Sequence, residues 1–300
     1  MALVSLTQGH LQLLELCPRR FQYTYLEKLI VPTDPATLQS QEWGNRFHRV
    51  MQQRQLGLEI APLLAQDPDL QTAVNSLLSI APELFQGQDP DRSLSEHRRG
   101  LMFNGYSLTV IYDLLLIGPT QVQIIDWKTY QHRPTLKQLR QNWQTRLYFY
   151  VLRETTSQPP EALSMTYWFV PPPQAGNAKP GYLTIPYSAT DHDRTQADLY
   201  RLTNYLTTLL STSQPLPQVA EDRGHCRPCP FAPRCQRYSQ EGGSLVEALA
   251  LPPIEDIPEI DARAMATGQG AEAGQNANPG SDWTDQPGFQ GSDQSYNSQP

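Results

Sequence analysis

The chain has 300 residues, of which 39% are apolar, and this share excludes a wholly disordered protein. It contains no apolar run of about 18 residues, which excludes a membrane-spanning helix. The net charge of −7 disfavours nucleic acid only if it is spread evenly. Nine acidic residues and one basic residue lie after position 242, so the 22 basic and 21 acidic residues before it leave a nearly neutral body. A DNA partner therefore stays open.

The body is predicted to contain helices, then strands, then helices. Apolar spacing predicts helices over 6–17, 39–56 and 69–78, the first ending where Pro18 prevents continuation. Strands over 106–117 and 121–127 flank a short turn and predict a β-hairpin. A long helix over 135–152, strands over 163–170 and 181–187, and a helix over 194–210 follow. We expect an α/β (α+β) domain with a mixed central sheet flanked by helices.

The N-terminal segment and the composition indicate the compartment and the extent of the folded domain. Residues 1–20 lack a basic leader, so no secretory signal is expected. Four cysteines, three of them within ten positions, do not resemble a secreted disulfide framework. We expect a cytoplasmic protein with a folded domain over 1–242. Residues 243–300 are acidic and rich in Gly, Gln, Asn, Ser and Pro, which predicts a disordered tail.

The predicted hairpin carries the residues with the most chemistry. Asp126 and Lys128 are two apart on one strand and therefore project from the same face. If Ile117 pairs with Val122 across the turn, Asp113 falls opposite Asp126, with Cβ atoms about 5 Å apart. Two such carboxylates repel unless a cation such as Mg²⁺ neutralises them. With Lys128 beside a water molecule, the group suits metal-assisted hydrolysis of a phosphodiester.

Two helices add polar residues on either side of this hairpin. His48 follows Gly44 on the second predicted helix, and Gln144 and Tyr148 share one face of the helix after the hairpin. Taken singly, each has an ordinary alternative: an aspartate at a strand end is usually solvated, and a lone helical histidine is usually a surface residue. Their order along the chain is more informative than any one of them.

That order resembles the PD-(D/E)XK nuclease superfamily, and within it the RecB-like branch. The resemblance implies a restriction-endonuclease-like fold over residues 5–240. It implies that Mg²⁺ or Mn²⁺ is held by His48, Asp113, Asp126 and the Trp127 carbonyl. It also implies catalytic roles for Asp113, Asp126, Lys128, Gln144 and Tyr148, with Lys128 serving the water and the last two positioning Lys128 or the DNA. The sequence departs from the family in one place, where Val110 replaces the usual glycine.

The cysteines form a second motif. Cys226, Cys229 and Cys235 have C-x₂-C-x₅-C spacing, and the fourth, Cys17, lies far upstream. Close cysteines in a reducing compartment are usually metal ligands, and thiolates suit both zinc and iron–sulfur clusters. Spacing does not choose between these, and His10 or His225 could complete a zinc site.

Resemblance does favour one cofactor. Some RecB-like nucleases, including the AddB nuclease domain and the CRISPR-associated exonuclease, hold a 4Fe–4S cluster with one early and three late cysteines. By this resemblance Cys17, Cys226, Cys229 and Cys235 bind such a cluster, which would join the two ends of the domain.

Basic and aromatic residues lie near both motifs. Such a mixture suits single-stranded DNA, although a solvated helix face explains Lys137 and Arg140 equally well. The residues are Arg19, Arg20, Tyr23 and Tyr25 near Cys17, and Arg98, Arg99, Arg133, Lys137 and Arg140 near the hairpin.

The function implied by the resemblance is a metal-dependent deoxyribonuclease, an exonuclease on single-stranded or frayed DNA ends. It would act in repair, recombination or CRISPR adaptation, with a separate helicase or CRISPR integrase proteins as partners and no membrane. The chain itself has no P-loop motif. Two alternatives remain, namely a non-catalytic DNA-binding subunit stabilised by a cluster or zinc, and a zinc protein of unrelated function.

Overall fold

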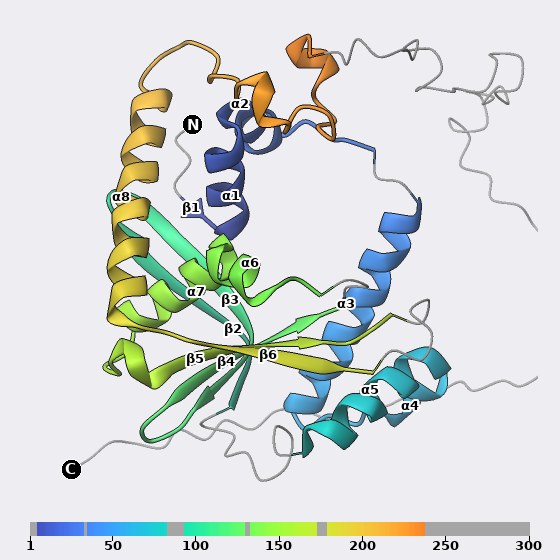
Figure 1. Cartoon of the computed structure of the whole chain (residues 1–300). Coiled ribbons are helices and arrows are strands. Elements are labelled where there is room, and N and C mark those ends of the chain that lie inside the picture. The colour runs from blue at the N-terminus through green and yellow to red at the C-terminus, as the bar shows by residue number, and fades with distance from the viewer. Residues whose placement is uncertain (1–4, 33–34, 83–92, 130–132, 173–178, 238–300) are drawn as a thin grey trace, which may run out of the picture. The chain divides into compact units, whose positions relative to one another are not determined.

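A computed structural model of the chain describes residues 5–32, 35–82, 93–129, 133–172 and 179–237 (Figure 1). The tail predicted over 243–300 lies outside the described residues. No helix in the described ranges is long and apolar enough to cross a membrane.

A mixed β-sheet forms the centre of the domain, as predicted. β2 lies along one edge of β3, while β4 and the short β1 pair with the other edge, and β5 and β6 follow β4. β4 and β5 are parallel, whereas β3–β4 and β5–β6 are antiparallel. The strands are β1 (Ser5–Leu6), β2 (Ser93–Phe103), β3 (Tyr106–Ile117), β4 (Val122–Lys128), β5 (Leu163–Phe169) and β6 (Gly181–Pro186).

The register predicted for the β3–β4 hairpin is confirmed. Ile117 pairs with Val122, and the ladder continues as far as Leu114 opposite Ile125. Asp113 and Asp126 are the next two residues, so they lie where the two strands cease to pair. This register places both carboxylates at one end of the hairpin.

A second hairpin, β2–β3, was not predicted. Its turn consists of Asn104 and Gly105, which both have positive φ angles, 47° and 85°. Two such residues form the type I′ turn that matches the twist of paired strands, and Asn-Gly is its commonest sequence. The turn pairs Phe103 with Tyr106 and so fixes the register of the whole of β2.

Eight α-helices surround the sheet in the described ranges. The helices predicted around α1, α3, α5 and α8 are confirmed, although α3 and α8 begin several residues earlier than expected and α5 begins one residue earlier. The helices are α1 (Gln8–Leu16), α2 (Pro18–Phe21), α3 (Pro35–Gln55), α4 (Ala61–Ala65), α5 (Pro68–Ile80), α6 (Leu136–Gln141), α7 (Trp143–Glu154) and α8 (Ala189–Leu210).

The prediction of one continuous helix over 135–152 was wrong. The chain leaves the helical conformation at Asn142, whose φ and ψ are −67° and 137°. The Asn142 side chain accepts a hydrogen bond from the backbone N–H of Gln144 at 2.8 Å and caps a new helix, α7. Asparagine is a strong N-cap because its side chain satisfies an N–H that the helix itself leaves unpaired. Gln144 therefore lies in the first turn of α7.

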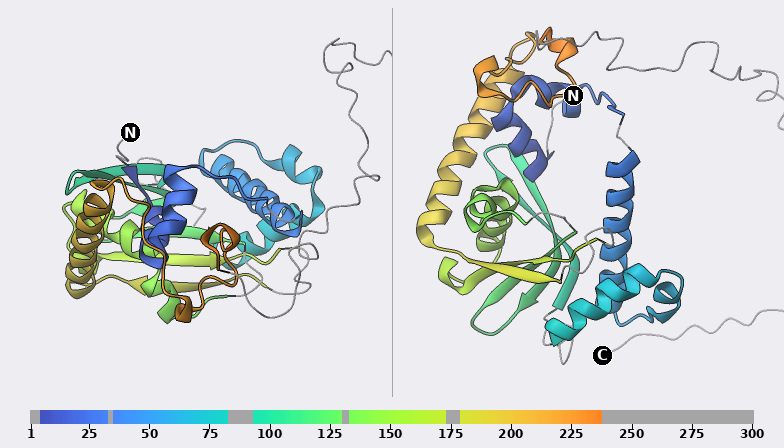
Figure 2. Two further views of the ribbon diagram at one scale, coloured as in Figure 1. Left: turned by 90° about the horizontal axis from the view of Figure 1, so that it is seen from above. Right: turned by 45° about the vertical axis from the view of Figure 1, so that its right-hand side comes forward.

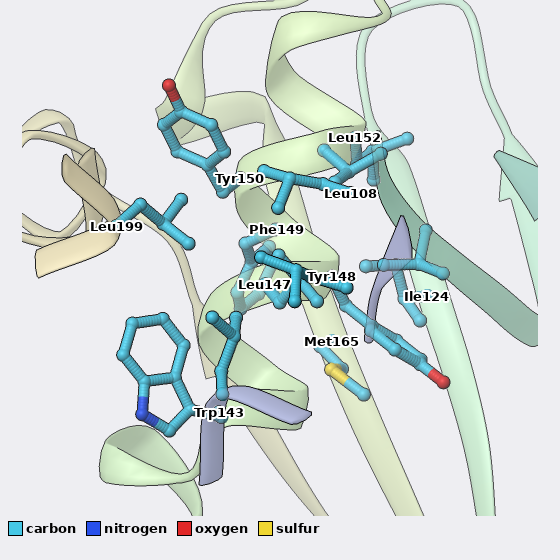
Figure 3. Close-up of a cluster of buried hydrophobic side chains, with 14 of the residues drawn as sticks. Leu108, Ile124, Trp143, Leu147, Tyr148, Phe149, Tyr150, Leu152, Met165 and Leu199 are labelled. Atoms are coloured by element: carbon cyan, nitrogen blue, oxygen red, sulfur yellow. The ribbon is translucent and has the colours of Figure 1, made fainter. Parts of the chain in front are cut away.

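Two hydrophobic cores pack against the sheet. Figures 1 and 2 show helices on both of its faces. Helices α1, α7 and α8 cover one face, and Figure 3 shows Leu147, Phe149 and Leu199 meeting there. Helices α3 and α5 cover the other, with Phe47 packed near Trp127. Each fully buried leucine or phenylalanine contributes roughly 1.5–3 kcal/mol, so both cores hold the sheet firmly. The polar hairpin end lies between α3 and α7.

Candidate active site

Asp126 lies at the centre of a buried polar group. Its side chain is 1% exposed, and its Oδ2 lies 2.5 Å from Nζ of Lys128. Its Oδ1 accepts a hydrogen bond of 2.6 Å from Nε2 of Gln144 in the first turn of α7. Three of the residues that the sequence singled out are thus in direct contact. Gln144 orients Asp126, whereas the resemblance implied that it would orient Lys128 or DNA.

The environment of Asp126 disfavours the ionised form of its carboxyl group. Burial raises the pKa of Asp126, and Asp113 raises it further, while Lys128 lowers it. A carboxylate held this far from water requires cationic neighbours, because desolvation disfavours its ionised form. Lys128 supplies one positive charge for the two carboxylates Asp126 and Asp113, so the site can accommodate a further cation.

His48 and Asp113 approach the same hairpin end from the other side. His48 Nδ1 lies 3.5 Å from Oδ2 of Asp113, and His48 Nε2 lies 3.1 Å from the carbonyl oxygen of Trp127. The Trp127 N–H donates a 2.8 Å hydrogen bond to Oδ2 of Asp113. Burial lowers the pKa of His48, but the hydrogen bond and charge of Asp113 outweigh it and leave the pKa above its ordinary value.

Gly44 explains how α3 comes so near the sheet. A Cβ atom at this position would lie 2.9 Å from Oγ1 of Thr129, the residue after β4. Only a glycine allows this approach without displacement of a neighbour. His48 is one helical turn further along α3, and the contact at Gly44 therefore brings its ring to the Trp127 carbonyl.

Tyr148 lies behind the polar group. Figure 3 shows it projecting from α7 toward the sheet. It is 4% exposed, and its ring meets that of Tyr112 edge to face at 5.3 Å. Burial raises the pKa of Tyr148, and the charge of Asp126 raises it further. In this position Tyr148 supports α7 and Gln144.

Sequence reasoning missed one residue of the site, Glu96 on β2. Ligand atoms of Glu96, His48 and Asp113 lie within 4.8 Å of one another, and no other set of three in the described ranges does so. Glu96 has a φ of 48°, a left-handed conformation that costs a non-glycine residue roughly 1–2 kcal/mol. The Asn104-Gly105 turn could have revealed it, because its register places Glu96 opposite Asp113.

The donor set suits a hard divalent cation. Carboxylate oxygens favour Mg²⁺ and Mn²⁺, and imidazole is compatible with Mn²⁺. The carboxylates of Asp113 and Glu96 lie close together, and the Trp127 carbonyl is beside His48. The residues present therefore fit the metal that the fold family implies.

The four cysteines come together far from this site. All of them line one small cavity between the end of α1 and the last described segment, and His225 lines it too. His10 does not: its Nδ1 contacts the Thr7 hydroxyl at 2.8 Å and its ring stacks on Tyr25. The potential metal ligands that line the cavity are Cys17, Cys226, Cys229, Cys235 and His225.

Hydrogen bonds tie the two ends of the domain together beside this cavity. The side-chain Nε of Arg19 donates a hydrogen bond to the carbonyl of Leu216 at 2.5 Å. The backbone N–H of Arg19 donates one to the carbonyl of Pro217 at 3.0 Å. Gln22 Oε1 accepts from the Leu216 N–H at 2.7 Å. The cavity is thus built by segments that are about 200 residues apart in sequence.

A groove with basic walls adjoins α7. Two neighbouring cavities of about 170 and 360 Å³ share Arg140, Gln141, Asp191 and Arg194, and the second is also lined by Lys137. No described residue forms an ion pair with Lys137, Arg140 or Arg194. Thr145, the neighbour of Gln144 in sequence, also lines the first of these cavities.

Comparisons with known proteins identify one family. Residues 5–236 match the sequence profile of the PD-(D/E)XK nuclease superfamily. The crystal structure of SSO0001 is 12% identical with a TM-score of 0.39, covering 80% of this chain and 89% of its own. A "putative exonuclease" from Eubacterium rectale is 10% identical with a TM-score of 0.46, covering 81% and 92%. No curated protein matches. The chain belongs to the PD-(D/E)XK nuclease superfamily.

Proposed function

We propose that this protein is a metal-dependent deoxyribonuclease that hydrolyses phosphodiester bonds. The observation that carries the proposal is the contact of Asp126 with both Lys128 and Gln144, next to the His48–Asp113 pair. Four elements, α3, β3, β4 and α7, supply these side chains, and the full burial of the Asp126 carboxylate among them has no evident benefit for stability.

We propose His48, Asp113, Asp126 and the Trp127 carbonyl as metal ligands. A bound Mg²⁺ or Mn²⁺ would polarise a phosphoryl oxygen and make an attacking water more acidic. The chain's own residues supply the rest. Lys128 Nζ, held by Asp126, is available to orient water and to balance the negative charge that develops on the phosphate. Gln144 fixes the Asp126 carboxylate in one orientation.

We propose single-stranded or frayed DNA as the substrate. Lys137, Arg140 and Arg194 form no ion pair with any residue that the structure describes, and they line the groove along α6 and α8, where phosphates are their natural partners. The preference for DNA ends, the role in repair, recombination or CRISPR adaptation, and the helicase or integrase partners rest on the RecB-like resemblance. The cytoplasmic location and the division into a nuclease domain over 1–242 and an acidic tail remain part of the same proposal.

We propose that the four cysteines bind a structural 4Fe–4S cluster. They line one cavity, yet no three ligand atoms among them lie within 4.8 Å of one another. A tetrahedral zinc ion with Zn–S distances of about 2.3 Å would hold its sulfur ligands within about 4 Å. The wider spacing supports a group larger than a single ion, and Cys17 would join the first helix to the last segment through it.

The first test measures cleavage of end-labelled single-stranded DNA with Mg²⁺, with Mn²⁺ and with EDTA. We expect metal-dependent cleavage that Asp126→Ala abolishes, while Glu59→Gln, an exposed acid elsewhere, leaves it intact. DNA binding is measured in parallel for Lys128→Ala. Binding without cleavage by the wild type, with its cysteine site loaded, would show a non-catalytic DNA-binding subunit instead.

The cysteine site is tested by metal analysis of anaerobically purified protein. We expect about four irons per chain and an absorbance typical of an iron–sulfur cluster, both lost in Cys229→Ser. One zinc per chain and no iron would contradict the cluster and leave the nuclease proposal unaffected, because the two sites do not share residues.

A further inference from the structure

We propose that Glu96 is a further ligand of the metal at this active site, and that the left-handed backbone of β2 at this residue serves to deliver its carboxylate. The inference rests on the proposed function, because it concerns the same metal. It adds a ligand that the Asp–Asp–Lys pattern of the sequence does not include.

The β2–β3 ladder is interrupted at one position only within its central part. Ser95 pairs with Leu114 and His97 pairs with Tyr112, in the register that the Asn104-Gly105 turn sets. Glu96, which should pair with Asp113, does not. Because the register is the same on both sides, no residue has been inserted, and the break is a local rotation of the backbone at Glu96 itself.

Glu96 lies close to a like charge. A Glu96 oxygen lies within 4.8 Å of both an Asp113 oxygen and a His48 nitrogen. No described residue donates a hydrogen bond to the Glu96 carboxylate, and Lys128, the nearby lysine, is paired with Asp126. Two carboxylates this close repel each other unless positive charge compensates them, and the His48 ring can supply at most one positive charge for the two. A strained backbone beside such an unfavourable contact is explained if a bound cation is part of the native site.

Protection of a sheet edge against association is an alternative role for Glu96, and it does not account for the backbone conformation of this residue. Among the described strands β2 pairs only with β3, so it is an edge strand there, and charged residues on edge strands discourage association with other sheets. That role needs an outward-facing charge on ordinary extended backbone. The left-handed conformation and the approach to His48 and Asp113 would have no purpose.

The experiment measures Mn²⁺ affinity of the full-length protein by EPR titration, without DNA. We expect Glu96→Gln to weaken Mn²⁺ binding at least tenfold and Glu59→Gln, on an exposed loop, to leave it unchanged. Asp113→Asn is the positive control and should also lose binding. In metal-free buffer, Glu96→Gly should melt a few degrees above Glu96→Gln, because both lack the charge but only glycine tolerates this φ without strain.

Two outcomes separate this inference from the proposed function. If Glu96→Gln binds Mn²⁺ within twofold of the wild type while Asp113→Asn does not bind, Glu96 is not a ligand and the nuclease proposal stands. If the wild type itself neither binds Mn²⁺ nor cleaves DNA, the proposed function fails and this inference fails with it. Equal melting temperatures for the two Glu96 variants would refute the role of the backbone strain.

Discussion

Replacement of Lys128 by methionine tests the electrostatic interpretation of the site through stability alone. Asp126 is 1% exposed and its Oδ2 lies 2.5 Å from Nζ of Lys128. Removing one partner of a buried ion pair leaves an uncompensated charge and typically costs about 3–5 kcal/mol. The Gln144 hydrogen bond to Asp126 survives the change and places the expected loss near the lower end, at about 3 kcal/mol.

The assay is thermal and urea unfolding in EDTA at neutral pH. A loss of about 3 kcal/mol corresponds to a Tm lowered by about 6–12 °C for a folded domain of this size. The double variant Asp126→Asn/Lys128→Met should regain most of the loss and lie within about 1 kcal/mol of the wild type, because neither charge remains. Lys137→Met, an exposed lysine on α6, should change stability by no more than about 0.5 kcal/mol.

The double variant distinguishes a stranded Asp126 carboxylate from lost packing of the lysine stem. If it is as unstable as Lys128→Met alone, the loss comes from packing of the lysine stem and not from a stranded carboxylate. If Lys128→Met is as stable as the wild type, Asp126 does not depend on Lys128 for charge compensation, and the reasoning is refuted.

Two further predictions concern other parts of the domain. Burial raises the pKa of Asp198, but hydrogen bonds from Arg146 and Arg201 outweigh it and lower the pKa below 3.8. Asp198→Asn should therefore lose about 1 kcal/mol at pH 7, and urea unfolding should show this difference from the wild type vanishing as the pH falls below 3.8. A difference independent of pH would contradict it. Arg140→Gln/Arg194→Gln should weaken single-stranded DNA binding in EDTA and reduce its salt slope by about 1.4. Fluorescence anisotropy measures the DNA affinity and its dependence on salt. An equal loss of affinity in Lys28→Gln/Arg223→Gln, two cations outside the groove, would show that the groove is not the DNA-binding surface.

Much of the fold could be predicted from local patterns. The β3–β4 hairpin followed from two apolar strands and the turn between them, and its register placed Asp113 and Asp126 at the same end. The cysteine spacing likewise singled out residues that the fold brings to one cavity. These features depend on residues near one another in sequence, where periodicity and turn geometry are sufficient.

Other features depended on signals that were weak or overlooked. The helix predicted over 135–152 has the right apolar period, and only the capping ability of Asn142 divides it in two. The division matters because it places Gln144 in a first turn, within reach of Asp126. The Asn104-Gly105 turn was visible in the sequence, and it would have given β2 and the position opposite Asp113.

Only the tertiary structure could decide which residues meet. Sequence by itself determined the family motif, the mixed sheet and the two sets of candidate ligands. The packing of Gly44 against Thr129 brings His48 to the Trp127 carbonyl, and the left-handed backbone at Glu96 interrupts the β2–β3 ladder beside Asp113. Such contacts depend on the approach of elements distant in sequence and on a strained dihedral angle, neither of which leaves a periodic pattern in the chain.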